Sequence, residues 1–291
     1  MNFRRILQLL PDKPYIQLMY YYHFHKFANL KNPQTFNEKL QWLKLYDRNP
    51  EYTIMVDKIA AKQYVTEKIG EEFIIPTLGV WNKPDEINFD TLPDQFVLKW
   101  NHDSHSVVIC EAKSDLDVIS TINKLRHGEK INGFWYGREW PYKNVQPKIL
   151  AEKYLVQDGI DANYGKMLID YKFMCFNGEV KCCFTCTGRS SKEGLKVTFY
   201  DTKWNILPFE RSHPKEMVPC KRPYSYDKMV WAAELLSQNI PFARIDFYEV
   251  GKVPYFGEIT LYPGSGMEAF QPEEWDRTLG EWIVLPKKLE K

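Results

Sequence analysis

The chain has 291 residues, of which 44% are hydrophobic and 26% charged, and its formal net charge at pH 7 is +1. This length is enough for a substantial core, in one large domain or two small ones. The near-neutral charge argues against a nucleic-acid-binding protein, because binding through phosphate neutralisation needs a basic face.

The chain begins with a short apolar run, Arg4–Leu10, which Pro11 ends too early for the hydrophobic part of a signal peptide. No run approaches the roughly 18–20 apolar residues that cross a bilayer. We therefore expect a cytoplasmic protein. Peripheral attachment at the inner face of the membrane through this first segment is the alternative.

Residues 1–70 are predicted to be helical. One helix follows Thr35, a candidate N-cap, and places apolar side chains at 40, 42, 43 and 46. A second helix is expected from about Thr53 to Ile69, where Gly70 ends it. Lys58 lies inside this second helix, and a lone lysine on a helix usually belongs to a solvated face.

A strand–loop–strand pattern follows between residues 96 and 110. Lys99 interrupts the apolar strand Phe96–Trp100, and a polar loop, Asn101–Ser106, separates it from a second strand. This layout is typical of a hairpin that covers phosphates, with the lysine acting as a point charge. The alternative is an ordinary hairpin with an edge lysine. A covering helix is expected at 115–127.

The middle of the chain combines an aromatic loop with further strands. The loop 133–141 either packs as a lid or offers its rings to a sugar, and packing is the commoner use of such residues. Strands are expected at 149–155, 168–176, 180–187 and 196–201, followed by a helix at 226–239 and a closing segment at 280–289. Cysteines at 182 and 186 alternate within a strand, which favours reduced thiols in a core over a metal site or a disulfide.

The stretch Phe242–Gly266 carries the acidic residues of greatest interest. It is predicted to form two strands joined by a three-residue turn, Val250–Lys252, around Gly251. Alternation places two sets of residues on one face of this pair: Arg244, Asp246 and Tyr248 from the first strand, and Phe256, Glu258 and Thr260 from the second.

A turn of this length sets the register of the two strands. It would place Arg244 opposite Glu258 and Asp246 opposite Phe256. The two carboxylates are then diagonal neighbours about 7–8 Å apart, and a bridging cation would offset their repulsion. The alternative is a solvated face with an arginine–aspartate pair. The glycine-rich exit, Tyr262–Gly266, favours the site, because its backbone amides can approach an anion.

Several segments across nearly the whole chain occur in an order and spacing typical of one family. They are Phe36–Lys39 with Trp42 and Leu43, Asp57–Lys58, Val97–Lys99, Ala151–Leu155, Asp170–Phe173, Ala243–Tyr248 and Gly257–Gly264. Together they resemble the ATP-grasp superfamily, and most closely its TupA-like branch, named for teichuronopeptide biosynthesis.

The resemblance implies an α+β fold in which two subdomains clasp ATP. We expect a short, mainly helical N-terminal region over 1–75, the small lid subdomain over 76–155, and the large subdomain with the metal site over 156–291. ATP and one or two Mg²⁺ ions are the implied cofactors.

The same resemblance implies roles for individual residues. Lys58 and Lys99 would touch the phosphates, the loop with Ser104 and Ser106 would close over them, and Arg244 would steady the reacting acyl group. The remaining implied contacts are adenine with Glu152, Lys153, Tyr154 and Leu155; ribose with Asp170, beside Lys172; magnesium with Asp246, Glu258 and Thr260; and the oxyanion with Gly264 and Gly266. Thr260 stands where many relatives have asparagine, and the phosphate loop lacks glycine.

The implied reaction is an ATP-dependent ligation of a carboxylate to an amine through an acyl phosphate. For this branch the expected carboxylate is a uronic acid of a surface polysaccharide or its precursor, and the amine is an amino acid or another amine. We expect no nucleic-acid partner, and peripheral association with membrane-bound glycan assembly machinery. The alternatives are a glycosyltransferase, an ATP-dependent sugar phosphotransferase and a binding module without catalytic activity. A glycosyltransferase would need an Asp-x-Asp metal motif, and the only such pattern in this sequence is Asp115–Asp117.

Overall fold

The computed structural model describes residues 8–103, 106–156, 168–188 and 194–287, and these residues form two main antiparallel sheets. The four-stranded sheet has the order β1-β4-β2-β3, the five-stranded sheet has the order β10-β9-β5-β6-β7, and β11 pairs with β8. The strands are β1 (Thr77–Trp81), β2 (Phe96–Trp100), β3 (Val108–Cys110), β4 (Ile149–Lys153), β5 (Asp170–Phe176), β6 (Glu179–Thr187), β7 (Lys196–Asp201), β8 (Glu210–Arg211), β9 (Phe242–Val250), β10 (Val253–Thr260) and β11 (Phe270–Gln271).

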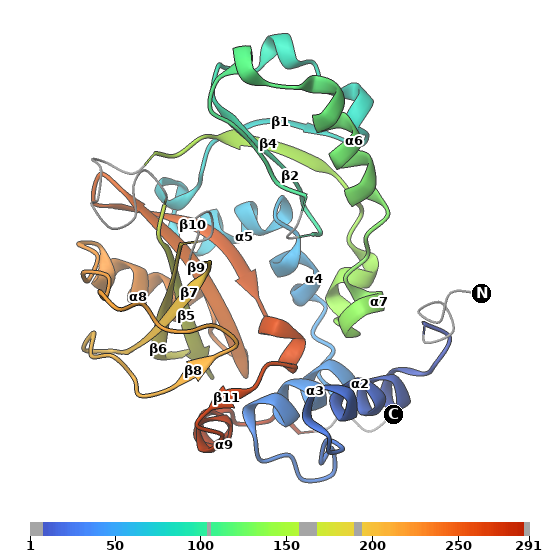
Figure 1. Cartoon of the computed structure of the whole chain (residues 1–291), viewed down its shortest axis with the longest axis vertical. Helices are drawn as coiled ribbons and strands as arrows, with labels where there is room; N and C mark the ends of the chain where they lie inside the picture. Colours follow the sequence, from blue (N-terminus) through green and yellow to red (C-terminus); the bar gives the residue numbers. More distant parts are fainter. Residues whose placement is uncertain (1–7, 104–105, 157–167, 189–193, 288–291) are drawn as a thin grey trace.

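The helices divide between the two sheets, as Figure 1 shows. Helix α6 covers the smaller sheet, whereas most of the others gather around the larger one. The α-helices of the described residues are α2 (Asp12–Phe24), α3 (Phe36–Tyr46), α4 (Glu51–Val56), α5 (Ala60–Ile69), α6 (Val118–Glu129), α7 (Phe134–Gly137), α8 (Tyr226–Leu236) and α9 (Glu274–Trp282).

The smaller sheet has its own core. Phe96, Leu98 and Trp100 alternate along β2 and are fully buried with Leu125 of α6. The Trp100 indole N–H donates to the Leu125 carbonyl at 2.9 Å, so the one polar atom of this large side chain is satisfied. This core holds β2, and with it Lys99, in a fixed orientation.

The N-terminal helices belong to the core of the larger sheet. Phe36 of α3 packs edge-on against Phe242 of β9, with ring centroids 4.9 Å apart. Val65 of α5 is fully buried in the same cluster. Helix α3 begins as expected, because Thr35 and Glu38 form a reciprocal capping box. The subdomain boundaries expected from the sequence stay predictions, but buried residues between Phe36 and Phe73 share their core with the larger sheet, whereas Tyr20, Ala28 and Leu30 form a separate small cluster.

The end of the chain differs from the expected short closing segment. Helix α9 occupies 274–282 and packs on α3, where the Asp276 carboxylate accepts the Asn37 N–H at 2.9 Å. Gly280 permits this close approach, since a Cβ there would lie 2.2 Å from the Gln34 carbonyl oxygen. Tertiary packing therefore extends this segment into a helix that the sequence pattern alone did not indicate.

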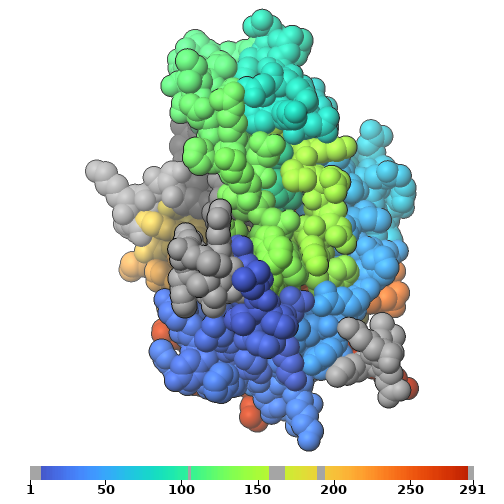
Figure 2. Space-filling view, turned by 90° about the vertical axis from the view of Figure 1, so that its right-hand side faces the viewer, coloured from blue at the N-terminus to red at the C-terminus, as the bar shows by residue number. Residues whose placement is uncertain are grey.

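The aromatic segment after α6 packs against the start of the chain. The Tyr15 hydroxyl of α2 donates to the Tyr136 carbonyl at 2.9 Å, and Arg138 donates to the Leu10 carbonyl at 2.9 Å. In the space-filling view these blue and green parts of the chain lie against each other (Figure 2). Packing, the safer of the two uses expected for the loop 133–141, accounts for Phe134 and Arg138, while Tyr136 stays exposed.

Two features of composition have simple structural outcomes. All six cysteines are buried with free thiols. Among the described residues, no helix has both the length and the apolar character to cross a membrane.

Candidate active site

The two strands that carry the acidic residues pair in a register different from the expected one. A two-residue turn, Gly251-Lys252, joins them, and both of its residues have positive φ, of 59° and 64°. This is the backbone twist that tight hairpins favour. The three-residue turn expected at 250–252 is therefore wrong.

A β-bulge in the second strand changes which of its side chains lie on the same face as Asp246. Gly257 is the extra residue, so Phe256 lies opposite Phe247 while Glu258 lies opposite Asp246. Alternation predicts Phe256 on the same face as Glu258, and this prediction is wrong: Phe256 is buried in the core. The carboxylates are directly opposed instead of diagonal, and Thr260 lies opposite Arg244.

Basic residues compensate the acid pair. Arg244 donates to both oxygens of Asp246 at 2.7 Å and to Glu258 Oε1 at 2.8 Å. Lys172 of β5 donates to Asp246 Oδ2, which also accepts from Arg244, and Lys58 Nζ lies 3.6 Å from Glu258 Oε2. The arginine–aspartate pair of the alternative interpretation is present, and three cations from separate elements contact the two carboxylates.

The charges of this cluster stabilise one another. Burial alone would raise the pKa of Glu258, but the cations led by Lys58 and Arg244 hold it far below its usual range. Burial would also lower the pKa of Lys172, but Asp170 and Asp246 raise it above the ordinary value. Glu258 is therefore ionised, and Lys172 is protonated, at neutral pH.

Lys58 reaches the cluster because the predicted helix 53–69 is broken. Helix α4 ends at Val56 and α5 begins at Ala60, and between them Asp57 has extended backbone angles. The Asp57 carboxylate accepts the Ile59 N–H at 2.9 Å, an N-terminal cap that competes with helix continuation. Lys58 then donates to the Asp103 carbonyl at 2.8 Å instead of lying on a solvated helix face.

Lys99 lies beside Glu152, and a second lysine joins them. Lys99 Nζ is 2.5 Å from one oxygen of the buried Glu152 carboxylate, and Lys62 of α5 is 2.7 Å from the other. Lys62 also donates to the Ile75 carbonyl at 2.6 Å, just before β1. Burial would raise the pKa of Glu152, but the two lysines lower it. Sequence reasoning missed Lys62, since only the tertiary contact between α5 and β4 gives it a role.

The phosphate loop is described only in part, because Ser104 lies outside the described residues. Ser106 is buried, and its hydroxyl donates to the Asp103 carboxylate at 2.6 Å. The Asp103 carbonyl accepts from Lys58, so the loop contacts the acid cluster through this lysine.

The expected adenine-binding segment leaves the end of β4. Lys153 is exposed, Tyr154 donates to Glu111 at 3.3 Å, and Leu155 is buried. The connection that follows, 157–167, is outside the described residues. Asp170, the expected ribose-binding acid, is buried at the start of β5 in the larger sheet, 3.8 Å from Lys172 of the same strand.

The turn after β10 is fixed by side chains that the sequence did not single out. Gly264 and Gly266 both have positive φ, and the Ser265 N–H donates to the Tyr262 carbonyl at 2.8 Å. Lys44 of α3, almost fully buried, donates to the Ser265 carbonyl at 2.7 Å and to the Gly137 carbonyl at 2.7 Å. Burial lowers the pKa of Lys44 to about 8.

The oxygen atoms of Asp246, Glu258 and Thr260 suit a hard divalent cation whose remaining ligands are waters and phosphates. In the part of the chain that the structure describes, no cluster of three or more His, Cys, Asp and Glu side chains is arranged to hold a metal. Asp246 and Glu258 are two opposed carboxylates, and the Thr260 hydroxyl lies 3.4 Å from Glu258 Oε1. Mg²⁺ characteristically takes one or two carboxylates and completes its shell with waters and substrate phosphates.

The Asp-x-Asp pattern Asp115–Asp117, considered above as a glycosyltransferase metal motif, lies at the start of helix α6. Asp117 caps α6 by accepting the Ser120 N–H at 2.9 Å, and Asp115 ends a short 3₁₀ turn.

A profile of the family described as TupA-like ATPgrasp matches residues 38–284, most of the chain. The chain belongs to this family. Membership confirms the ATP-grasp, TupA-like assignment, and the mixed helices and antiparallel sheets agree with the expected α+β ATP-grasp fold. No curated protein sequence matches the chain.

Solved structures with a similar fold are distant in sequence. The D-alanine–D-alanine ligase of Bacillus anthracis complexed with ATP is 16% identical with a TM-score of 0.44, and the match covers 79% of this chain and 65% of that one. The ATP-grasp ligase PsnB, complexed with minimal precursor, Mg and ADP, is 12% identical with a TM-score of 0.40, covering 77% and 57%. A RimK domain ATP-grasp protein of Sphaerobacter thermophilus is 9% identical with a TM-score of 0.42, covering 82% and 70%. The match thus spans less than two thirds of the length of the first two of these proteins.

Proposed function

We propose that this protein is an ATP- and Mg²⁺-dependent ligase that joins a carboxylate to an amine through an acyl phosphate. The observation that carries the proposal is the pair of opposed carboxylates, Asp246 and Glu258, held by Arg244 in a chain of the ATP-grasp family. Lys58 and Lys172 add positive charge around the pair. Such a cluster suits a triphosphate and a divalent cation.

In this proposal the nucleotide binds between the two sheets. The lid subdomain is residues 76–155 and the large subdomain is residues 156–291. Lys58 and Lys99 bind phosphates, so Lys99 exchanges its contact with Glu152 for one with ATP. Ser104 and Ser106 belong to the loop that covers the phosphates. Adenine contacts Glu152, Lys153, Tyr154 and Leu155, and ribose contacts Asp170, with Lys172 beside it.

The chemistry requires two anions to meet. A substrate carboxylate attacks the γ-phosphorus of ATP, the bond from this phosphorus to the β,γ-bridging oxygen breaks, and ADP leaves with that bond's electrons; the cations of the site offset the repulsion between the two anions. Asp246, Glu258 and Thr260 would hold Mg²⁺, which would supply Lewis-acid polarisation of the phosphate oxygens. A neutral amine then attacks the acyl carbon, a C–N bond forms, phosphate leaves with the electrons of the C–O bond, and the amine nitrogen gives up one proton to water or to the departing phosphate.

The chain's own residues have defined tasks in the second step. Arg244 orients the acyl group, and the backbone amides of Gly264 and Gly266 are the proposed donors to the oxyanion. One such donor contributes about 3–4 kcal/mol of transition-state stabilisation in well-studied hydrolases. Closure of the lid excludes water, which would hydrolyse the acyl phosphate.

The proposed carboxylate is a uronic acid of a surface polysaccharide or its precursor, coupled to an amino acid or another amine. The resemblance to the branch named for teichuronopeptide biosynthesis supports this choice. The exposed rings of Trp135 and Tyr136 are compatible with a sugar, since aromatic faces pack on sugar rings. Peripheral contact with membrane-bound glycan assembly machinery belongs to the same proposal.

The test is to incubate the protein with ATP, Mg²⁺, glucuronate or galacturonate, and hydroxylamine, and to measure ADP and hydroxamate. A ligase gives both products, because hydroxylamine captures the acyl phosphate. A stable phosphorylated sugar without hydroxamate would identify a phosphotransferase. Consumption of a sugar nucleotide without ATP would identify a glycosyltransferase, and either result contradicts the proposal.

A further inference from the structure

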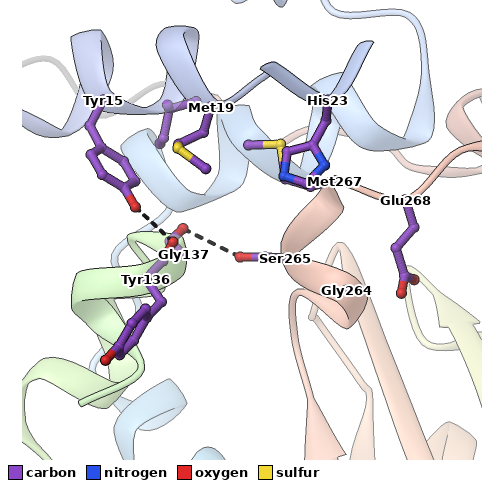
Figure 3. A pocket seen from close by; sticks show the side chains of 10 residues that line it. Tyr15, Met19, His23, Tyr136, Gly137, Gly264, Ser265, Met267 and Glu268 are labelled. Carbon is purple, nitrogen blue, oxygen red and sulfur yellow. Dashed lines mark hydrogen bonds between the residues drawn. The ribbon is translucent and has the colours of Figure 1, made fainter. Parts of the chain in front are cut away.

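A pocket of about 290 Å³ lies between the N-terminal helix α2, the short helix α7 and the turn after β10. Figure 3 shows side chains of α2 pointing toward this turn, with the Ser265 hydroxyl directed at Gly137. The residues that line it are Tyr15, Ile16, Met19, His23, Tyr136, Gly137, Gly264, Ser265, Met267 and Glu268. This volume is near the lower end of the range for small-molecule sites, enough for an amino acid or one sugar ring.

The lining is acidic or neutral, in contrast to the nucleotide site. Among the described residues, those that line the pocket include one carboxylate, Glu268, and no lysine or arginine. Burial lowers the pKa of His23, which keeps its imidazole neutral at pH 7. A free carboxylate or phosphate would find no counter-charge in this lining, whereas an amine would find acceptor oxygens.

The nearby cations are directed at other partners. Arg211 donates to Glu268 at 2.6 Å and to the Pro263 carbonyl at 2.7 Å. Lys44 donates to the carbonyls of Gly137 and Ser265, so it joins two walls of the pocket from behind. Lys44 and Arg211 thus contact residues of the pocket wall, but neither is among the residues that line the pocket.

The pocket adjoins the acid cluster through one shared side chain. The Ser265 hydroxyl lines the pocket and donates to Glu139 Oε1 at 2.8 Å. Burial raises the pKa of Glu139, and the charges of Lys44 and Arg244 act against this rise. Arg244 in turn binds Asp246 and Glu258. Ser265 thus links the pocket to Glu139, which interacts electrostatically with Arg244 of the acid cluster.

We propose that this pocket binds the amine substrate, a small primary amine whose inserted part carries no anionic group. The assignment rests on the proposed ligase function and adds a substrate class to it: the basic cluster receives the anionic reactants and the pocket receives the amine. The N-terminal helix α2 then has a part in recognition, through Tyr15, Met19 and His23.

The test measures binding directly, without ATP, so that it does not depend on the ligase assay. Glucosamine and glycinamide are the amine probes, and glucuronate and acetate are the anionic probes, each titrated by ligand-observed NMR. Both amines bind the wild-type protein in the proposed arrangement. Met19→Trp, which fills the pocket, weakens amine binding at least tenfold. Tyr22→Trp, an exposed position on the same helix, leaves it unchanged.

A second pair of variants tests the charge argument. Met19→Lys adds a cation to the pocket and weakens amine binding at least tenfold, whereas Met19→Gln, of similar size, does not. Circular dichroism and thermal melting verify that each variant is folded. The proposal is overturned if neither amine binds the wild type, if Met19→Trp binds amines as tightly as the wild type, or if Met19→Lys and Met19→Gln behave alike. Loss of hydroxamate formation alone would instead contradict the proposed ligase.

Discussion

Glu258 lies directly opposite Asp246 across β9 and β10, and one guanidinium, that of Arg244, binds both carboxylates. The bulge at Gly257 makes this pairing possible, because it returns Glu258 to the face of Asp246 after Phe256 has turned into the core. The relationship links a single backbone irregularity to the proposed metal site.

Glu258→Gln is expected to lower the rate of ADP release roughly 100-fold or more, the scale on which loss of one group that stabilises transition-state charge acts. The amide keeps the shape of the side chain but removes the negative charge that interacts with Lys58 and that would bind Mg²⁺. Coupled-enzyme measurement of ADP tests this, with Glu179→Gln as the control, because Glu179 is an exposed carboxylate at the start of β6. Unchanged turnover with Glu258→Gln would remove this residue as a metal ligand.

Lys62→Met is expected to raise the KM for ATP about tenfold with a smaller change in kcat, as loss of a positioning contact does. Lys62 joins α5 to Glu152 and to the chain before β1, so the variant loosens the proposed adenine-binding segment. Steady-state kinetics with varied ATP measures the effect. Lys68→Met, an exposed position on the same helix, serves as the control. Equal KM values for both variants would show that Lys62 does not position Glu152.

Gly257→Val is expected to lower the free energy of unfolding by about 1–3 kcal/mol, because a side chain overpacks the bulge. A Cβ at this position would lie 3.2 Å from the Asp246 carbonyl oxygen and from the Tyr248 ring. Urea unfolding measures the change. Gly133→Val is the control, since the nearest atom to its Cβ would be at 3.6 Å. A neutral result at Gly257 would mean that the bulge tolerates a side chain.

Stability is expected to depend on pH through Lys44. Burial lowers its pKa in the folded state to about 8 from an ordinary value of 10.5. Between these values the unfolded chain binds more protons than the folded one, so the contribution of Lys44 to stability rises with pH from 8 to 10.5. Below pH 8 the full cost of burying the charge is present. Urea unfolding of the wild type and of Lys44→Met at pH 7.5, 8.5 and 9.5 tests this: the difference between the two stabilities should grow in favour of the wild type as pH rises. A constant difference would contradict it.

Local signals sufficed where the determinants lie close together in sequence. Helix α3 follows from Thr35 and Glu38, which form their capping box within one turn. The hairpin of β9 and β10 follows from alternation and from Gly251. Alternation alone places Arg244 and Asp246 on one face of β9, whereas Glu258 joins them only through the bulge at Gly257.

The rest depended on contacts that the sequence pattern does not encode. The apolar period runs through residues 53–69 without interruption, yet the helix breaks at Asp57, whose carboxylate accepts the Ile59 N–H. Lys58 then contacts Asp103 and Glu258, which are distant in sequence. The register of β9 and β10 depends on where a bulge forms, and glycine only permits one there. Lys62 and Lys44 gain their roles from partners more than 85 residues away, which periodicity cannot indicate.

The helical start of the chain has a consequence for any attempt to define a minimal catalytic unit. Helices α3 and α5 and the break before α5 supply Lys44, Lys58 and Lys62, although both sheets begin only after residue 76. A fragment trimmed to the sheets would keep Asp246, Glu258 and Glu152 together with Arg244, Lys172 and Lys99, but it would lose Lys58 beside Glu258 and Lys62 beside Glu152. Less of the negative charge would then be offset, so the fragment would bind a nucleotide more weakly even where its strands still paired.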